Sequence, residues 1–256
     1  MSRLLLTLQY DGTRYHGWQV QRNALTVQEV LQDAVERITG VRSGITGCSR
    51  TDAGVHAFMF CCAMDTGSPL RGERMIRALN ACLPGDIAVT GCREVSPDFH
   101  PRYMAAGKRY RYQIWNGPAR NPFYNRYALH RMGRLDEEKM NRTASLFVGT
   151  HDFSAFCASG SEVEDRVRTV RSAHVEREGD LLRFRVEADG FLYNMVRILV
   201  GTLLDVQSRR LEEARILEAL RTGDRSLAGF TAPAHGLFLE EVFYPEEVLE
   251  WQKSGT

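Results

Sequence analysis

Hydrophobic residues follow strand-like and helix-like patterns through the first part of the chain. Residues 3–10 predict a strand, and the apolar positions that follow Thr26 recur at the spacing of one helix face. Thr26 and Glu29 form a capping box at the start of this helix, and Gly40 ends it. Further patterns predict strands around residues 45–48 and 58–64, a helix around 75–83 and a strand over 87–95. The predicted order is therefore β-α-β-β-α-β.

The second part of the chain repeats this order. Its predicted elements are a strand over residues 109–115, a helix over 136–147, strands over 170–177 and 182–188, helices over 191–206 and 211–221, and a last strand over 237–243. Alternation is clearest in the strand where Leu182, Phe184 and Val186 face one way and Arg183 and Arg185 face the other. A sheet that is covered on one face requires such a pattern.

Together these patterns predict an α+β protein made of two ferredoxin-like βαββαβ halves, residues 1–98 and residues 99–256. We expect the two antiparallel sheets to pack together around a central cleft, with the helices on one face of each sheet. A cleft of this kind is the natural place for a substrate.

Composition narrows the class of protein. The chain has 256 residues, 43% apolar and 25% charged, which is typical of a globular fold. Six cysteines lack regular spacing and include the adjacent pair Cys61 and Cys62, which favours a reducing compartment over a secreted disulfide framework. No stretch approaches the length of a signal-peptide core or a membrane span. We therefore expect a cytoplasmic protein with no membrane contact.

Positive charge is concentrated in one segment, residues 99–134. This segment carries +8 with no Asp or Glu, so a chain with a net charge of +1 leaves −7 on the remainder. It also holds eight aromatic residues: Phe99, Tyr103, Tyr110, Tyr112, Trp115, Phe123, Tyr124 and Tyr127. Basic side chains neutralise phosphates and flat rings stack on bases, so the mixture suits an RNA surface. A solvated charged face over buried rings would give the same composition.

A predicted loop around Asp52 places an arginine, a carboxylate, a glycine and a histidine close together, in the sequence Ser49-Arg50-Thr51-Asp52-Ala53-Gly54-Val55-His56-Ala57. Loops that a rigid scaffold holds often carry catalytic groups. An Asp in such a turn also commonly caps its own backbone, so the pattern by itself leaves a purely structural role open.

The predicted helix over residues 191–206 carries one basic residue, Arg197, on a largely apolar surface. A buried guanidinium needs an anionic or carbonyl partner. Asp205 lies roughly 12 Å further along the helix axis and is too far away. Asp52 is one possible partner from another part of the chain, and Asp189 or carbonyl oxygens are the alternatives.

Seven motifs, in order along nearly the whole chain, resemble the bacterial tRNA pseudouridine synthase A family. They are Tyr10-Asp11-Gly12-Thr13 with Gly17-Trp18-Gln19, Thr26-Val27-Gln28, Arg50-Thr51-Asp52-Ala53-Gly54-Val55-His56-Ala57, Lys108-Arg109-Tyr110-Arg111-Tyr112, Gly149-Thr150-His151-Asp152-Phe153, Met195-Val196-Arg197 with Val200-Gly201, and Thr231-Ala232-Pro233-Ala234 with Gly236-Leu237. The resemblance implies an isomerase that converts uridine to pseudouridine in the anticodon stem-loop of tRNA, at positions thirty-eight to forty. It also implies a homodimer and no metal or organic cofactor.

The same resemblance implies roles for individual residues. Asp52 would be the catalytic nucleophile and Arg197 its ion-pair partner, while Tyr110 would pack on the target base and Arg50 would help to displace that base from the stem. Lys108 and Arg111, from the basic strand, are expected to contact the RNA. The family usually has glycine at position 49, so Ser49 raises a question about the backbone before Arg50.

Two other functions are open at this point. The chain could be an RNA-binding module without catalysis, in which Asp52 only closes a turn. A metal-dependent hydrolase could draw its ligands from the cysteines and from six of the seven histidines, namely His56, His100, His130, His151, His174 and His235. Because no Cys-x-x-Cys or His-x-x-x-His spacing occurs, we expect no metal site.

Overall fold

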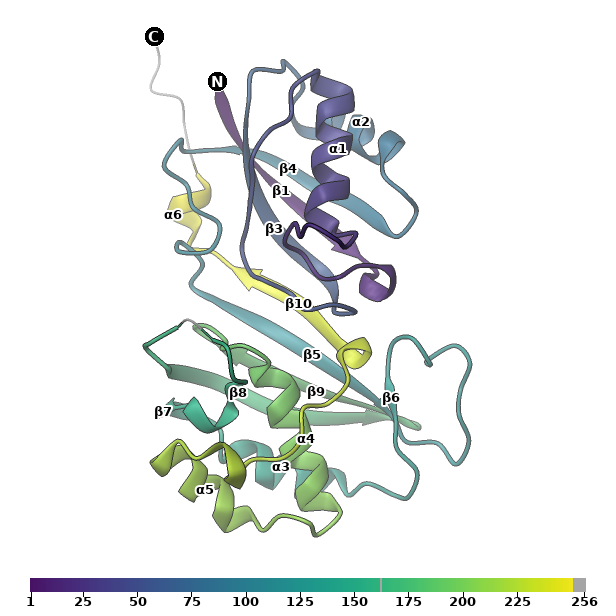
Figure 1. Ribbon diagram of the computed structural model, residues 1–256, viewed down its shortest axis with the longest axis vertical. Helices are drawn as coiled ribbons and strands as arrows, with labels where there is room; N and C mark the ends of the chain where they lie inside the picture. Colours follow the sequence, from purple (N-terminus) through teal and green to yellow (C-terminus); the bar gives the residue numbers. More distant parts are fainter. Residues whose placement is uncertain (162, 251–256) are drawn as a thin grey trace. The chain divides into compact units, whose positions relative to one another are not determined.

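The computed structural model describes residues 1–161 and 163–250, and it divides into two compact units (Figure 1). The first unit comprises Met1–Ala106 and the residues from Leu239 on, and the second unit is Gly107–Phe238. The boundary therefore lies at 106/107 and not at 98/99, and the last strand counts largely with the first unit. Two contacts hold residues 99–106 to the first unit. The ring of Phe99 lies 5.4 Å from that of Tyr244, and Ala106 N donates a hydrogen bond to Phe243 O at 2.8 Å.

The first unit is a sheet with its two long helices on one face. Its elements are β1 (Ser2–Tyr10), α1 (Val27–Thr39), β2 (Ile45–Gly47), β3 (His56–Thr66), α2 (Gly72–Cys82), β4 (Ile87–Val95), β10 (Leu237–Phe243) and α6 (Glu246–Leu249). The strand order is β4-β1-β3-β10, and β2 pairs with β3. Strand β1 is antiparallel to both β3 and β4, and α1 contacts α2 (Figure 1). The predicted β-α-β-β-α-β order is confirmed.

Helix α1 begins and ends as its sequence predicts. The Thr26 side chain accepts a hydrogen bond from Glu29 N at 3.3 Å, and Gly40 ends the helix in the left-handed conformation with φ of 74°. Val27 and Leu31, on the inner face of this helix, are fully buried. The helix therefore holds the segment before Thr26 at a defined place.

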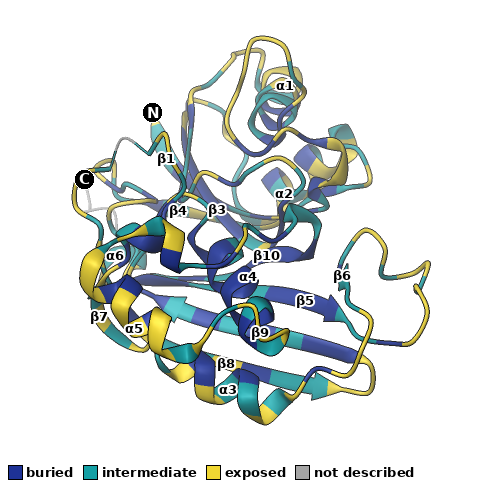
Figure 2. Ribbon diagram, turned by 60° about the horizontal axis from the view of Figure 1, so that its bottom comes forward, coloured by how far each residue is buried: buried dark blue, intermediate teal, exposed yellow. Residues whose placement is uncertain are grey.

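The second unit is also an antiparallel sheet with helices on one face. Its elements are β5 (Gly107–Trp115), β6 (Leu129–His130), α3 (Glu137–Ser145), β7 (Gly149–Asp152), β8 (Val167–Glu178), β9 (Leu181–Ala188), α4 (Met195–Gln207) and α5 (Glu213–Thr222). The order is β5-β9-β8-β7, with the short β6 parallel to β5. Figure 2 shows α4 almost entirely buried, whereas α5 alternates between buried and exposed residues.

The predicted alternation in β9 is confirmed: Leu182, Phe184 and Val186 are fully buried, whereas Arg183 and Arg185 are half-buried on the other face. The α+β class is confirmed as well. The short strands β6 and β7, of two and four residues, were not predicted, because so few residues carry too little periodicity.

Candidate active site

The Asp52 loop, residues 48–55, connects β2 to β3 in the first unit. Antiparallel pairing fixes the start of the loop, with Gly47 opposite Cys62 and with Cys48 N donating to Cys61 O at 2.8 Å. Within the loop, Val55 N donates to Asp52 O at 3.2 Å. Strand pairing therefore sets the position at which the loop leaves the sheet.

Two glycines from the preceding segment support this loop from the inside. A Cβ on Gly12 would lie 2.0 Å from Val55 O, and a Cβ on Gly17, whose φ is +82°, would lie 2.2 Å from Thr51 O. Trp18 N donates to that same Thr51 oxygen at 3.1 Å. Only glycine permits such an approach of one backbone to another. The two N-terminal motifs therefore accompany the Asp52 motif because they form its support.

Buried side chains lock the same arrangement. The hydroxyls of Tyr10 and Thr51 are hydrogen-bonded at 2.9 Å. His56, which is 1% exposed, accepts the Gly12 N–H at its Nδ1 over 3.0 Å, and the same nitrogen lies 3.1 Å from Asp11 Oδ1. A ring nitrogen that accepts a backbone N–H has no lone pair left for a metal ion. His56 is therefore a support of the loop.

The Thr26-Val27-Gln28 motif connects this supporting segment to helix α1. Val27 N donates to Gly17 O at 3.2 Å and Gln28 N to Trp18 O at 3.0 Å. The Gln28 side chain accepts from Val20 N and donates to Ile45 O, at 2.9 and 2.7 Å. Position and rigidity of the Asp52 loop thus come from α1, β2 and the 10–18 segment together.

Two of the predicted site residues, Arg50 and Asp52, lie on this supported loop. Asp52 is half-buried, and Arg50 is exposed. Ser49 is not among the residues with positive φ, so serine fits there without left-handed strain, and the question about position 49 is answered. A carboxylate that is partly shielded and held by rigid backbone suits a nucleophile or a base.

The predicted residues of β5 lie on two opposite faces of the strand. Tyr110 is 6% exposed and meets Phe191 edge-on at 4.9 Å, and Lys108, on the same face, is 8% exposed. Arg111 lies on the other face, 5.4 Å above the ring of Phe238. Because neighbouring side chains alternate along a strand, Lys108 and Arg111 cannot serve one common surface.

Arg197 lies on α4 and is held by two oxygens of its own unit. Its Nε donates to Ala232 O at 2.7 Å and its Nη1 donates to Asn194 Oδ1 at 2.6 Å. Carbonyl oxygen, one of the expected partners, is therefore found. The other alternative, Asp189, accepts from Thr169 N at 3.0 Å.

Asn194 holds Arg197 in place and was not among the predicted site residues. It begins α4 in the left-handed conformation, with φ of 60°, and its side chain aims the guanidinium of Arg197. An asparagine directly before a helix and three residues before a buried arginine is the signal that could have identified it.

Three of the motifs meet around Arg197: those of residues 108–112, 195–201 and 231–234. A Cβ on Gly201 would lie 1.7 Å from Phe230 O, so α4 packs directly on the 230–234 segment. Tyr112 O–H donates to Pro233 O at 2.8 Å. Burial raises the pKa of Tyr112, and the positive charge of Arg197 opposes that rise. The second unit thus builds a buried aromatic and cationic cluster.

Residues 1–161 and 163–250 contain no group of three or more His, Cys, Asp or Glu side chains that could hold a metal ion. Over the same residues, every helix is too short or too polar to cross a membrane.

Comparison with known proteins gives one consistent result. The family model described as tRNA pseudouridine synthase matches residues 7–104 and 143–245. A protein of Acetivibrio thermocellus named tRNA pseudouridine synthase A is 46% identical over 244 residues, which cover 95% of this chain and all of that protein. A protein of the same name from Thermoanaerobacter sp. strain X514 is 44% identical over the same share of each chain.

Among solved structures, a chain of a Cbf5–Nop10–Gar1 complex is similar over 94% of this chain and 59% of its own length, at 14% identity and a TM-score of 0.39. That likeness is too low to carry an argument. The family match and the full-length relatives are sufficient by themselves: the chain belongs to the tRNA pseudouridine synthase family.

Proposed function

We propose that this protein converts uridine to pseudouridine in tRNA, at positions thirty-eight to forty of the anticodon stem-loop, and that it acts as a cytoplasmic homodimer. The observation that carries this proposal is that the N-terminal motifs of a chain with full-length relatives in this family support one loop, the one that bears Asp52. Six cysteines without a disulfide suit a reducing compartment.

The reaction breaks the bond from sugar C1′ to base N1, turns the uracil and joins C1′ to C5. No atom is gained or lost, so the step needs no redox partner. In this proposal an ionised Asp52 carboxylate attacks C1′ or C6, or assists departure of the base. Displacement of water by the nucleotide would raise the pKa of Asp52, so a nearby cation is needed to keep the anion.

Arg197 supplies that cation in this proposal. Its contacts with Ala232 and Asn194 give the guanidinium one orientation before substrate arrives. We infer that it pairs with Asp52. A preorganised ion pair of this kind lowers the cost of holding the nucleophile charged.

The remaining residues would replace the stacking interactions that the target base loses when it leaves the stem. Extrusion of a nucleotide costs a few kcal/mol. Tyr110 would hold the face of the uracil, and stacking on an aromatic ring contributes about 1 to 3 kcal/mol. Arg50, which is exposed, would fill the vacated position. Lys108 and Arg111 would contact the RNA separately, because they lie on opposite faces of β5.

The test compares wild type with Asp52→Ala on unmodified tRNA. We expect the wild type to form pseudouridine at the three positions, and the variant to bind tRNA without forming product. Equal activity in both would end the nucleophile assignment. Binding by both proteins with no product from either would favour an RNA-binding module without catalysis.

Two further measurements address the other parts of the proposal. Activity in the presence of a chelator should equal activity without it, whereas a loss would point to a metal-dependent reaction. Sedimentation should give the mass of two chains, and a monomer that is fully active would refute the homodimer.

A further inference from the structure

A long basic loop, residues 117–134, follows β5 and includes the short strand β6 (Figure 1). It contains four arginines and no carboxylate: Arg120, Arg126, Arg131 and Arg134. Two large apolar side chains on it are directed into water, with Phe123 85% exposed and Met132 77% exposed. The loop lies inside 105–142, the stretch between the two matches of the family model.

The interior of this loop is held by its own hydrogen bonds. The rings of Trp115 and Tyr124 are stacked at 5.1 Å, and Trp115 Nε1 donates to Ala119 O at 2.8 Å. Tyr127 N and Ala128 N both donate to Tyr124 O, at 2.9 and 2.8 Å. Loops longer than about 12 to 15 residues are uncommon in compact domains and are usually either functional or disordered. This loop is built to keep one shape.

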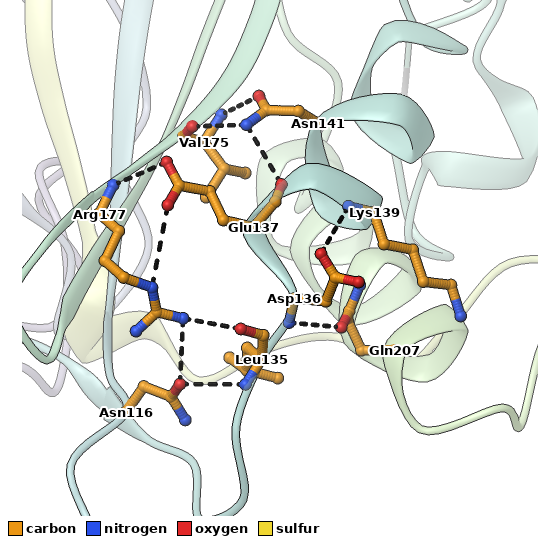
Figure 3. A network of polar contacts seen from close by, with 9 residues as sticks. All are labelled: Asn116, Leu135, Asp136, Glu137, Lys139, Asn141, Val175, Arg177 and Gln207. Atoms are coloured by element: carbon orange, nitrogen blue, oxygen red, sulfur yellow. Dashed lines mark hydrogen bonds and ion pairs between the residues drawn. The ribbon is translucent and has the colours of Figure 1, made fainter.

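Asn116 joins the start of the loop to its end (Figure 3). Its Nδ2 donates to Arg131 O and Gly133 O, both at 2.7 Å. Its Oδ1 accepts from Leu135 N at 3.1 Å and from Arg177 Nη2 at 3.2 Å. Both N–H groups and the oxygen of the Asn116 side-chain amide therefore form hydrogen bonds that close the loop.

Arg177 completes this clamp from β8. Its Nη2 also donates to Leu135 O at 2.8 Å, and its Nε lies 3.9 Å from a carboxylate oxygen of Glu137, the first residue of α3 (Figure 3). The loop is therefore anchored to a strand and a helix of the same unit, while Phe123 stays in solvent.

We propose that residues 117–134 form a preformed RNA-binding element that holds the tRNA outside the nucleotide being isomerised. Phe123 stacks on an unpaired base, and Arg120 and Arg134 neutralise phosphates. This rests on the proposed function only in taking tRNA as the ligand. A polyanion with unpaired bases is favoured because four cations without a carboxylate complement a row of phosphates and the exposed ring of Phe123 can stack on a base, whereas the same loop of a second copy would be repelled. Preorganisation by Asn116 removes part of the ordering cost of binding.

Stacking predicts the size of the effect. Phe123→Ala should raise KM and the tRNA dissociation constant by roughly tenfold to a hundredfold, with kcat unchanged. Its control is Leu217→Ala, because Leu217 is also exposed and lies in the same unit, on α5. The double variant Arg120→Gln and Arg134→Gln should lower the slope of log affinity against log salt by about 2.

Asn116→Ala tests the clamp, and Asn141→Ala is its match. The Asn141 side-chain amide also hydrogen-bonds to backbone groups: Nδ2 donates to Val175 O and Oδ1 accepts from Val175 N, both at 2.8 Å. These bonds lie outside the loop. Asn116→Ala should raise KM and speed tryptic cleavage within the loop, whereas Asn141→Ala should do neither even where its melting temperature falls as far.

Three results would overturn the proposal: a KM for Phe123→Ala within twofold of wild type, a fall in kcat at unchanged KM, or dissociation of a dimer by Phe123→Ala with unchanged RNA affinity. The last result would assign the loop to a second copy of the chain. Binding measured in the Asp52→Ala background separates this proposal from the previous one. Loss of affinity there supports the loop even if wild type forms no pseudouridine.

Discussion

Replacing Gly12 with alanine pushes directly on the loop that carries Asp52. The new Cβ would lie 2.0 Å from Val55 O and 2.6 Å from Val55 C. Both are backbone atoms, so no flexible side chain can turn away. Ordinary van der Waals contact begins at 3.4 Å, and the loop or Gly12 must therefore shift by about 1.4 Å.

The size of this shift sets the expected loss. Misplacing a catalytic group by about 1 Å costs on the order of a hundredfold in rate. The strain itself should cost about 1 to 3 kcal/mol of folding free energy. In a chain of this length each kcal/mol lowers the melting temperature by roughly 2 to 4 °C. The variant should therefore stay folded at 25 °C and still lose about two orders of magnitude in activity.

Single-turnover pseudouridine formation on unmodified tRNA, with enzyme in excess, measures the rate independently of product release. Gly44→Ala is the matched control, because a Cβ on Gly44 meets nothing within 4 Å and Gly44 directly precedes β2. The control should react at the wild-type rate. A Gly12→Ala rate within threefold of wild type, at an unchanged melting temperature, would refute the idea that this contact positions the loop.

Three other predictions concern charge and hydrogen bonding. Arg197→Met should fold and bind tRNA yet lose most turnover, because in the proposed mechanism the carboxylate of Asp52 loses the cation that pairs with it; near-wild-type turnover would place the partner elsewhere. His56→Asn keeps an acceptor for Gly12 N–H and should retain most activity, whereas His56→Ala should lose about 1 to 3 kcal/mol of stability by thermal unfolding; equal losses would contradict the supporting role. Burial raises the pKa of Tyr15 to about 12, so between pH 10 and 12 the folded chain keeps a proton that the unfolded chain has lost, and the free energy of unfolding falls. Tyr15→Phe should make that fall shallower, and an unchanged slope would exclude Tyr15 as a contributor.

Local patterns were sufficient to predict the principal helices and strands. Alternation in β9 and the capping box of α1 are properties of short segments, so they survive in the fold unchanged. The helix predicted over residues 191–206 begins later, at Met195, because Asn194 adopts a left-handed conformation. The predicted division at residue 98 differs from the observed boundary because Ala106 N bonds to Phe243 O, a contact between distant parts of the sequence.

The site was predictable where a motif carries the chemistry and not where packing does. Asp52 and Arg197 stand out by residue type and context. The opposite faces of Lys108 and Arg111 follow from strand alternation alone and could have been predicted. The close approach of Gly12 to the backbone of Val55 could not have been predicted, because a contact between two backbones produces no periodic pattern in the sequence.

The clamp of Asn116 is a further case that sequence does not reveal. Its partners include a backbone oxygen of Arg131 and the side chain of Arg177, which lies 61 positions along the chain. Backbone acceptors are common to every residue, so nothing in the composition of residues 131–135 marks them as partners.

The proposed reaction depends most directly on the negative charge of the Asp52 carboxylate. Asp52→Asn removes that charge with almost no change in shape, so tRNA binding and melting temperature should equal those of wild type. With enzyme in excess over unmodified tRNA, we expect this variant to form no more pseudouridine than a reaction without enzyme. Product formed within tenfold of the wild-type rate would contradict it, because the chemistry would then proceed without the Asp52 anion.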